Sequence, residues 1–227
     1  MMKRIALIVA GGKGTRMGNA VPKQFMELVH KPVLMHTLEK FRYVCDKIIL
    51  VLPADQVVYW EKLCSMHNFS IPHQIVNGGD TRLHSVFNGL QAADAESIVA
   101  IHDGARPMVD ETTIRQSFEV AEQKSNAICA VQLKDSIREV DGENSFARNR
   151  SRFVMIQTPQ TFQYPVIFKA YSDLMQSGEA LDTFTDDASV AERNNIKIHL
   201  MEGHYENIKI TTKEDLIIAE AILRSRG

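Results

Sequence analysis

The sequence has few cysteines, no long apolar run and no large excess of charge of either sign. Three cysteines occur in 227 residues, far apart, without a C-x-x-C pair or a histidine at metal-ligand spacing. This spacing argues against a disulfide framework or a zinc site and fits a reducing, cytoplasmic location. The net charge of −2 gives no reason to expect broad binding to nucleic acid or to an anionic membrane.

The apolar segment at the N-terminus is also too short to target or anchor the chain. About seven apolar residues precede the first glycines, too few for a signal peptide and far too few for a membrane span. Apolar residues make up 44% of the chain and charged residues 24%, which is enough apolar material for a real core. We therefore expect one domain over residues 1–227 that binds neither membrane nor nucleic acid.

Short apolar runs alternate with amphipathic stretches, the pattern of a mostly parallel sheet flanked by helices. The expected fold is therefore α/β and Rossmann-like. The spacing of Thr211 and Glu214 predicts a capping box at the start of the last helix. Strands are expected over residues 4–10, 47–52, 74–76, 97–102, 127–133, 196–201 and 206–212, and helices over 32–43, 54–67, 81–93, 111–123, 166–176 and from 212 onward.

Residues 134–152 are polar and interrupt this pattern. The segment VDGEN, residues 140–144, predicts a hairpin turn between two extended pieces. A polar hairpin of this kind has little to bury within its own chain. It is either an arm that packs on a partner subunit or a mobile surface loop.

A glycine turn follows the first predicted strand. Such a turn can present backbone N–H groups and a helix dipole to an anion. Gly12, Gly14 and Gly18 have the spacing G-x-G-x-x-x-G, which matches neither the Rossmann fingerprint nor the Walker A motif. Arg16 lies within the turn and Lys23 just after it. A guanidinium and an ammonium placed there can neutralise a polyphosphate as negative charge develops on it.

Six sequence segments, in order over nearly the whole chain, resemble a known family. They are AGGKGTRMG with PKQF, GGDTRLHSV, HDGARP, QTPQTF, TDDAS and NIKITTKEDL. Together they resemble the 2-C-methyl-D-erythritol 4-phosphate cytidylyltransferases, which act on polyol phosphates in isoprenoid precursor biosynthesis. The resemblance implies that CTP and a polyol phosphate are the substrates, that Mg²⁺ is the cofactor and that pyrophosphate is released.

The same resemblance implies roles for residues around the nucleotide. Arg16 and Lys23 would contact the triphosphate and stabilise the transition state. Asp103, at the end of a predicted strand, would lie near the ribose and Mg²⁺ and is the expected metal ligand. The expected nucleotide-binding residues are Ala10, Gly11, Gly12, Gly14, Gly78, Gly79, Asp80, Ser85, Asp103 and Gly104.

For the second substrate, the resemblance implies contacts from both the main body and the polar hairpin. Ser136 and Arg150 correspond to residues that reach across a homodimer interface, which would make residues 134–152 a dimerisation arm. Arg150 and Lys209 are expected to be catalytic together with Arg16 and Lys23. The expected substrate-binding residues are Arg106, Ser136, Arg150, Thr158, Asp186 and Lys209.

Three alternatives remain open from the sequence. The closest in chemistry is a D-ribitol 5-phosphate cytidylyltransferase, which uses much the same nucleotide machinery on a longer polyol. A dinucleotide-binding oxidoreductase is disfavoured by the glycine spacing and by the lack of an acidic residue directly after the second strand. A non-catalytic nucleotide-binding protein is disfavoured because binding alone would not need both Arg16 and Lys23.

Overall fold

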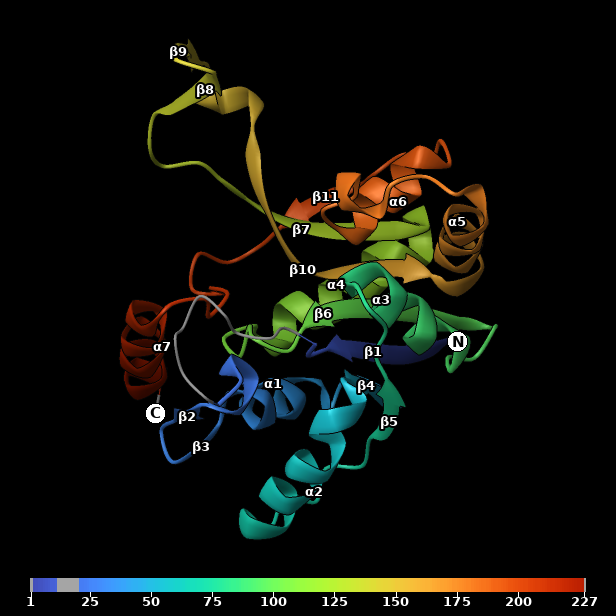
Figure 1. Cartoon of the computed structure of the whole chain (residues 1–227), viewed down its shortest axis with the longest axis vertical. Coiled ribbons are helices and arrows are strands. Elements are labelled where there is room, and N and C mark those ends of the chain that lie inside the picture. The colour runs from blue at the N-terminus through green and yellow to red at the C-terminus, as the bar shows by residue number, and fades with distance from the viewer. Residues whose placement is uncertain (1, 12–20, 227) are drawn as a thin grey trace.

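The computed structural model describes residues 2–11 and 21–226. Within them, the main sheet has seven strands in the order β11-β7-β10-β6-β1-β4-β5 (Figure 1). Neighbouring strands are parallel except at β10, which is antiparallel to both β6 and β7. The expected mostly parallel α/β fold is confirmed. The strands are β1 (Lys3–Val9), β4 (Lys47–Leu52), β5 (Gln74–Asn77), β6 (Ser97–Asp103), β7 (Asn126–Gln132), β10 (Val154–Gln163) and β11 (Leu200–Glu202).

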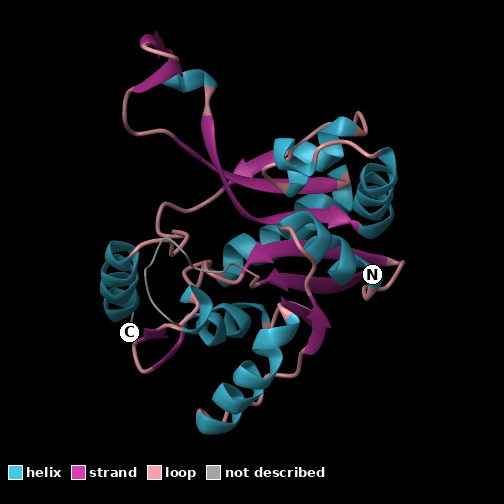
Figure 2. Ribbon diagram, in the orientation of Figure 1, coloured by secondary structure: helices cyan, strands magenta, loops and turns pink. Residues whose placement is uncertain are grey.

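Helices cover both faces of this sheet (Figures 1 and 2), and a hydrophobic core lies on each side. The central strands β1, β4 and β6 are mainly Ile, Leu, Val and Ala, as expected of strands buried on both faces. None of the described helices is long and apolar enough to cross a membrane. One face packs on α1 (Val33–Phe41), α2 (Val57–Met66) and α4 (Glu111–Lys124), and the other on α3 (Arg82–Gln91), α5 (Tyr164–Ser177) and α6 (Asp187–Arg193).

Capped helix starts bring polar side chains to the carboxyl edge of the sheet. β1 and β6 are parallel neighbours in which Val9 pairs with Asp103, so the loops that follow them lie side by side. The Thr81 hydroxyl accepts a hydrogen bond from the backbone N–H of His84 at 3.2 Å and caps α3. Asp186 caps α6 in the same way through the N–H of Ser189, at 2.9 Å. In open α/β sheets this edge is where ligands bind.

The predicted hairpin at residues 134–152 is present. It consists of β8 (Ile137–Asp141) and β9 (Asn144–Arg148), which pair antiparallel and project away from the main sheet (Figure 1). Gly142 has φ +56°, the left-handed conformation that such a tight turn requires. Nearly every residue of the hairpin is exposed, so it has no core of its own within this chain.

Three predictions for the C-terminal third are wrong. The strand expected at 196–201 is confined to β11, and the segment 206–212 is not a strand. Ile210 is buried and its N–H bonds to the carbonyl of Ala105, so this segment packs on a loop rather than on a sheet edge. The last helix, α7 (Lys213–Arg226), has its capping box one residue later than expected, between Thr212 and Asp215.

Candidate active site

Asp103, the last residue of β6, is the centre of a charged cluster. It is 8% exposed. Its carboxylate lies 3.0 Å from Nζ of Lys209, 3.3 Å from Nε of Arg106 and 3.7 Å from Nε of Arg82. Three cations from three separate chain segments therefore surround one buried carboxylate.

The electrostatic balance keeps Asp103 ionised. Burial by itself would raise the pKa of this carboxyl, because the charged form loses its hydration. The charges of Lys209, Arg82 and Arg106 outweigh that effect and hold the pKa of Asp103 well below its usual range. The cluster is thus a carboxylate with an excess of cationic groups, which is an environment suited to phosphate.

Hydrogen bonds hold the segment that carries Lys209 against the segments of Arg106 and Thr158. Arg106 donates from Nη1 to the carbonyl of Asn207 at 2.8 Å, and Asn207 donates from Nδ2 to the carbonyl of Thr158 at 2.8 Å. Asn207 is fully buried. These bonds fix the segment that carries Lys209, which explains how a stretch without sheet pairing holds its position.

A buried histidine aligns the backbone next to Asp103. The hydroxyl of Thr158 accepts from the N–H of Asp103 at 3.1 Å and lies 3.0 Å from Nδ1 of His102. The hydroxyl therefore donates to Nδ1, and Nε2 carries the proton that is donated to the carbonyl of Arg106 at 3.1 Å. Burial lowers the pKa of His102 to about 4, so the ring is neutral at pH 7. Thr158 is 4% exposed, and its hydroxyl already has these two partners.

Arg82, the first residue of α3, is held from behind by a buried carboxylate. Its Nη1 and Nη2 donate to the two oxygens of Asp187 at 2.8 and 2.7 Å. The hydroxyl of Tyr171 donates to Asp187 at 2.6 Å, and both Asp187 and Tyr171 are fully buried. Burial would lower the pKa of Arg82, but Asp187 outweighs it and raises that pKa well above its usual value.

One cavity of about 310 Å³ opens on one side of Asp103. Most of the described residues that were expected to bind nucleotide line it. The cavity also contains Arg82 and Lys209. The expected residues in its wall are Ala10, Gly11, Lys23, Gly79, Asp80, Ser85 and Asp103.

The Gly78–Asp80 turn is held close to α3. The N–H of Gly79 donates to the hydroxyl of Ser85 at 3.1 Å, and that hydroxyl donates to the carbonyl of Thr81 at 2.9 Å. A Cβ on Gly79 would lie 2.5 Å from Cβ of His84, so a side chain cannot be added without moving the turn. The glycine therefore brings bare backbone to the wall of the cavity.

A second cavity of about 290 Å³ opens on the other side of Asp103. Arg82, Asp103 and Lys209 belong to the walls of both cavities, so the two share one boundary. Four of the expected substrate-binding residues line the second cavity: Arg106, Thr158, Asp186 and Lys209.

Other expected site residues lie outside these cavities. Gly78 and Gly104 support them from behind, since a Cβ on Gly104 would lie 2.8 Å from Cβ of Ala10. Ser136 and Arg150 lie at the base of the hairpin, where Arg150 donates to the carbonyl of Lys134. Neither belongs to the described wall of either cavity. Gly12, Gly14 and Arg16 lie outside the described residues.

Several residues in the walls of the two cavities were not singled out from the sequence, among them Arg82 and Gln24. Arg82 lies in the segment GGDTRLHSV, and only its partner Asp187, 105 positions away, reveals its place. Gln24, in the segment PKQF, is 1% exposed and donates from Nε2 to the carbonyl of Ala10 at 2.8 Å, at the start of the glycine turn. For both residues, the signal available in the sequence was a polar or charged side chain inside one of the six matched segments.

The surroundings of Asp103 fit the prediction of a protein-bound Mg²⁺ poorly. Mg²⁺ prefers several oxygen ligands, commonly carboxylates and water. Asp103 instead faces three cations, and the described residues contain no group of three His, Cys, Asp or Glu side chains that could hold a metal ion.

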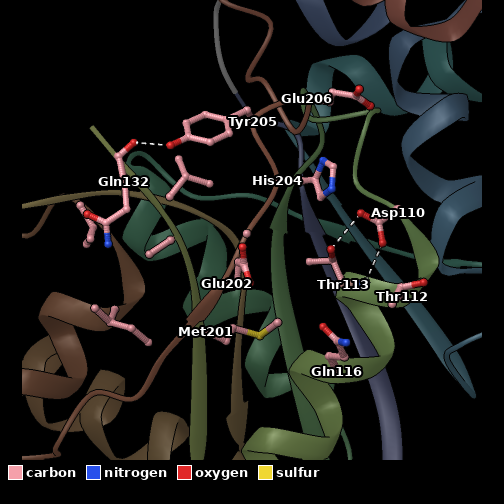
Figure 3. Close-up of a pocket in the computed structure, with 15 residues that line it drawn as sticks. Asp110, Thr112, Thr113, Gln116, Gln132, Met201, Glu202, His204, Tyr205 and Glu206 are labelled. Carbon is pink, nitrogen blue, oxygen red and sulfur yellow. Dashed lines mark hydrogen bonds between the residues drawn. The ribbon is translucent and has the colours of Figure 1, made fainter. Parts of the chain in front are cut away.

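A larger cavity of about 950 Å³ lies elsewhere, beside the edge strand β11 (Figure 3). Asp110 bonds to Thr113 at the start of α4 on one side, and the Tyr205 hydroxyl donates to the carbonyl of Gln132 on the other. Leu200, at its edge, is 54% exposed. Among the residues that the structure describes, this cavity shares no wall residue with the two around Asp103.

Comparison with known sequences gives full-length matches. A model of the 2-C-methyl-D-erythritol 4-phosphate cytidylyltransferase family matches residues 4–225. A protein of that name from Bacteroides thetaiotaomicron is 46% identical over 224 residues, which cover 98% of this chain and 100% of the relative. One from Porphyromonas gingivalis (strain ATCC 33277) is 45% identical over 224 residues, covering 98% and 99%.

Solved structures agree with the sequence matches. The crystal structure of 4-diphosphocytidyl-2C-methyl-D-erythritol synthase from Anaerococcus prevotii has a TM-score of 0.83 at 31% identity, covering 98% of this chain and 99% of its own. The 2-C-methyl-D-erythritol 4-phosphate cytidylyltransferase of Thermus thermophilus has a TM-score of 0.77 at 25% identity, covering 96% and 98%. The oxidoreductase and non-catalytic alternatives are therefore set aside. The chain belongs to the 2-C-methyl-D-erythritol 4-phosphate cytidylyltransferase family.

Proposed function

We propose that the two cavities around Asp103 hold CTP and 2-C-methyl-D-erythritol 4-phosphate, which the chain converts to 4-diphosphocytidyl-2-C-methyl-D-erythritol and pyrophosphate. The observation that carries this assignment is the shared wall of Arg82, Asp103 and Lys209. A transferase must hold two substrates with their reacting phosphates in contact. Two cavities that meet at a cationic wall provide that arrangement.

The chemistry needs positioning and charge more than a base. An oxygen of the substrate phosphate forms a bond to the α-phosphorus of CTP, and the bond from that phosphorus to the bridging oxygen breaks as pyrophosphate leaves. A phosphate monoester is largely ionised at neutral pH, so no proton has to be removed. Lys209 and Arg106 would hold the attacking phosphate, while Lys23 and Arg16 would stabilise charge on the triphosphate.

The Mg²⁺ requirement remains part of this proposal, with a changed site. The sequence predicted Asp103 as the metal ligand, but Asp103 faces three cations, so we instead assign the ion to the triphosphate, and MgCTP is then the form of the nucleotide that binds. Removal of Mg²⁺ with EDTA should then abolish turnover. An enzyme that turns over equally well in EDTA would contradict this assignment.

We also propose that the chain acts as a homodimer through its arm, residues 134–152. Apolar side chains are exposed along the hairpin and at the start of β10, where the described residues of one chain leave them uncovered. The same end of the molecule carries the large cavity with its exposed Leu200 and Tyr205. The exposed apolar side chains are Val140 (72%), Phe146 (51%), Phe153 (46%), Met155 (46%) and Ile156 (37%).

Dimerisation can be tested by changing two of these side chains. The double variant Phe146→Ser and Phe153→Ser should sediment as a monomer, while the wild type sediments as a dimer at the same micromolar concentration. Val58→Ser is the matched control, because Val58 is 74% exposed on α2, far from the arm in the chain. A wild-type protein that sediments as a monomer would refute the dimer.

We propose a cytoplasmic location on the evidence of the thiols. Cys45, Cys64 and Cys129 are all free. Burial raises the pKa of Cys64 to about 11 and that of Cys129 to about 12, so neither supplies a thiolate at neutral pH. The cysteines thus have a packing role, which suits a reducing compartment.

The function is tested by pyrophosphate release from CTP and Mg²⁺ with each of two polyol phosphates. We expect release with 2-C-methyl-D-erythritol 4-phosphate and at least about a hundredfold lower kcat/KM with D-ribitol 5-phosphate. Higher kcat/KM with ribitol 5-phosphate would assign the other substrate. No release with either would overturn the proposed function.

A further inference from the structure

We infer that Arg82 is a further substrate-binding residue, which contacts the reacting phosphates where the two cavities meet, and that Asp187 and Tyr171 are the positioning residues that hold it there. This inference rests on the function proposed above. It assigns a chemical partner, phosphate, to a guanidinium whose role the sequence motifs left open.

The position of Arg82 is the first argument. It opens α3 directly after the cap Thr81, and its side chain, 28% exposed, belongs to the walls of both cavities. Only Asp103 and Lys209 share that property among the described residues of the two walls. A residue common to both walls lies where the attacking phosphate and the α-phosphate must meet.

The second argument is how the guanidinium is oriented. Both Nη atoms are bound by Asp187, so this edge of the side chain points into the protein. The Nε edge points toward Asp103, at 3.7 Å, which is beyond hydrogen-bond distance. Arg82 is therefore fixed at one edge, while its other edge can approach a phosphate oxygen with little rearrangement.

The third argument is the cost of the anchor. A fully buried carboxylate is expensive to maintain and often contributes little net stability even when paired. Asp187 has its charge compensated by Arg82 and one further hydrogen bond from Tyr171. An apolar contact between α3, α5 and α6 could join these helices as well, and the hydrophobic core on this face already does so. The ion pair therefore contributes a guanidinium whose orientation is fixed.

The experiment compares three variants of the full-length protein by kcat, by KM for each substrate and by melting temperature. Arg82→Lys keeps the charge but loses the two-pronged geometry, so we expect a ten- to hundredfold lower kcat with KM for CTP changed less than about threefold. Tyr171→Phe removes one hydrogen bond from Asp187, and we expect a three- to tenfold lower kcat. Asp187→Asn should lower kcat more than either of these variants, provided that it folds. If it does not fold, Tyr171→Phe still tests the inference.

Tyr164→Phe is the matched control, because Tyr164 lies on the same helix and stacks on Phe168. Its kcat should stay at the wild-type value. A merely structural role would lower the melting temperature of Arg82→Lys or Tyr171→Phe while leaving kcat unchanged, and that result would overturn the inference.

A binding readout separates this inference from the proposed function. Inorganic phosphate, which stands in for the attacking phosphate, should raise the melting temperature of the wild type and of Tyr164→Phe, with a smaller rise for Arg82→Lys. If the wild type releases no pyrophosphate with either polyol phosphate but shows this pattern, the proposed function fails and the Arg82 site stands. An equal rise in all three proteins would overturn the Arg82 site.

Discussion

The Asp103 cluster and the arm carry two halves of the expected site, and only the first half is assembled within one chain. Around Asp103, charged side chains from distant segments are buried, paired and fixed by hydrogen bonds. In the arm, Arg150 bonds only locally in the described contacts, and large apolar side chains face solvent. The buried pairing is why we propose the substrate site at Asp103, and the exposed apolar surface beside the expected arm residues is why we propose that a partner subunit covers the arm.

The two regions also differ in the size of their cavities and in the charged groups that line them. The cavity of about 950 Å³ lies near the base of the arm, and among the described residues its wall holds no cluster of cations around a carboxylate like that of Asp103 (Figure 3). The smaller cavities, of about 310 and 290 Å³, share the Asp103 cluster. The charged groups at the wall, more than the volume, are the reason why we propose the substrate site at the Asp103 cluster.

The largest effect is expected at Lys209. Lys209→Met removes the cation nearest to Asp103 from the shared wall, so kcat/KM should fall about 10³-fold. Pyrophosphate release measures this loss. Lys213→Met, an exposed neighbour at the start of α7, should retain wild-type activity. Equal activity of the two variants would remove Lys209 from the site.

A smaller loss is expected in the arm. Arg150→Met should lower kcat/KM by about 10²-fold, because a phosphate contact supplied by the partner is lost. Arg138→Met, in the same hairpin, is the control, since Arg138 bonds only to Ser145 within the hairpin in the described contacts. If both variants keep full activity, the arm has no catalytic role.

Asp103 gives a prediction for stability against pH. Its folded pKa is depressed, so its contribution is present above the unfolded pKa, near 4, and is lost as the pH falls through the folded value. Asp103→Asn should lower the free energy of unfolding by about 1.5–3 kcal/mol at pH 7. Chemical denaturation measures this gap, the difference in the free energy of unfolding between the wild type and Asp103→Asn. The gap should be smaller at pH 3 than at pH 7. A gap that widens at pH 3 would contradict the assigned ion pairs.

The smallest effect concerns the backbone of the cavity in which we propose that CTP binds. Gly79→Ala places a Cβ 2.5 Å from Cβ of His84 and should cost about 1 kcal/mol while raising KM for CTP. Gly11→Ala is the control for stability alone, because among the described residues the nearest atom to its added Cβ is Oγ of Ser85, 3.8 Å away. The melting temperature is measured for both variants, and KM for CTP is measured for Gly79→Ala. A neutral Gly79→Ala would show that the turn is free to move.

Much of the fold could be predicted because its signals are local. Apolar runs predicted the central strands, and VDGEN predicted the turn of the hairpin. The segment 206–212 shows the limit of that method. Its alternating Ile208 and Ile210 resemble a strand, yet Ile210 packs beside Met108 and Ala219, and the backbone bonds to a loop.

Part of the candidate site could also be predicted, because its signals are local. Short motifs carried Asp103, Lys209 and the Gly78–Asp80 turn, which the structure brings to two adjoining cavities. The pair of Arg82 and Asp187 could not be predicted from spacing, because it depends on how α3 packs against α5 and α6.

The central claim is that each site combines the Asp103 cluster of one chain with the arm of another. It is tested most directly by co-expressing Lys209→Met and Arg150→Met and measuring pyrophosphate release. Half of the dimers should be mixed, each with one intact site, so activity should recover to about a quarter of the wild-type value. Activity no higher than the mean of the two separate variants would contradict the shared site.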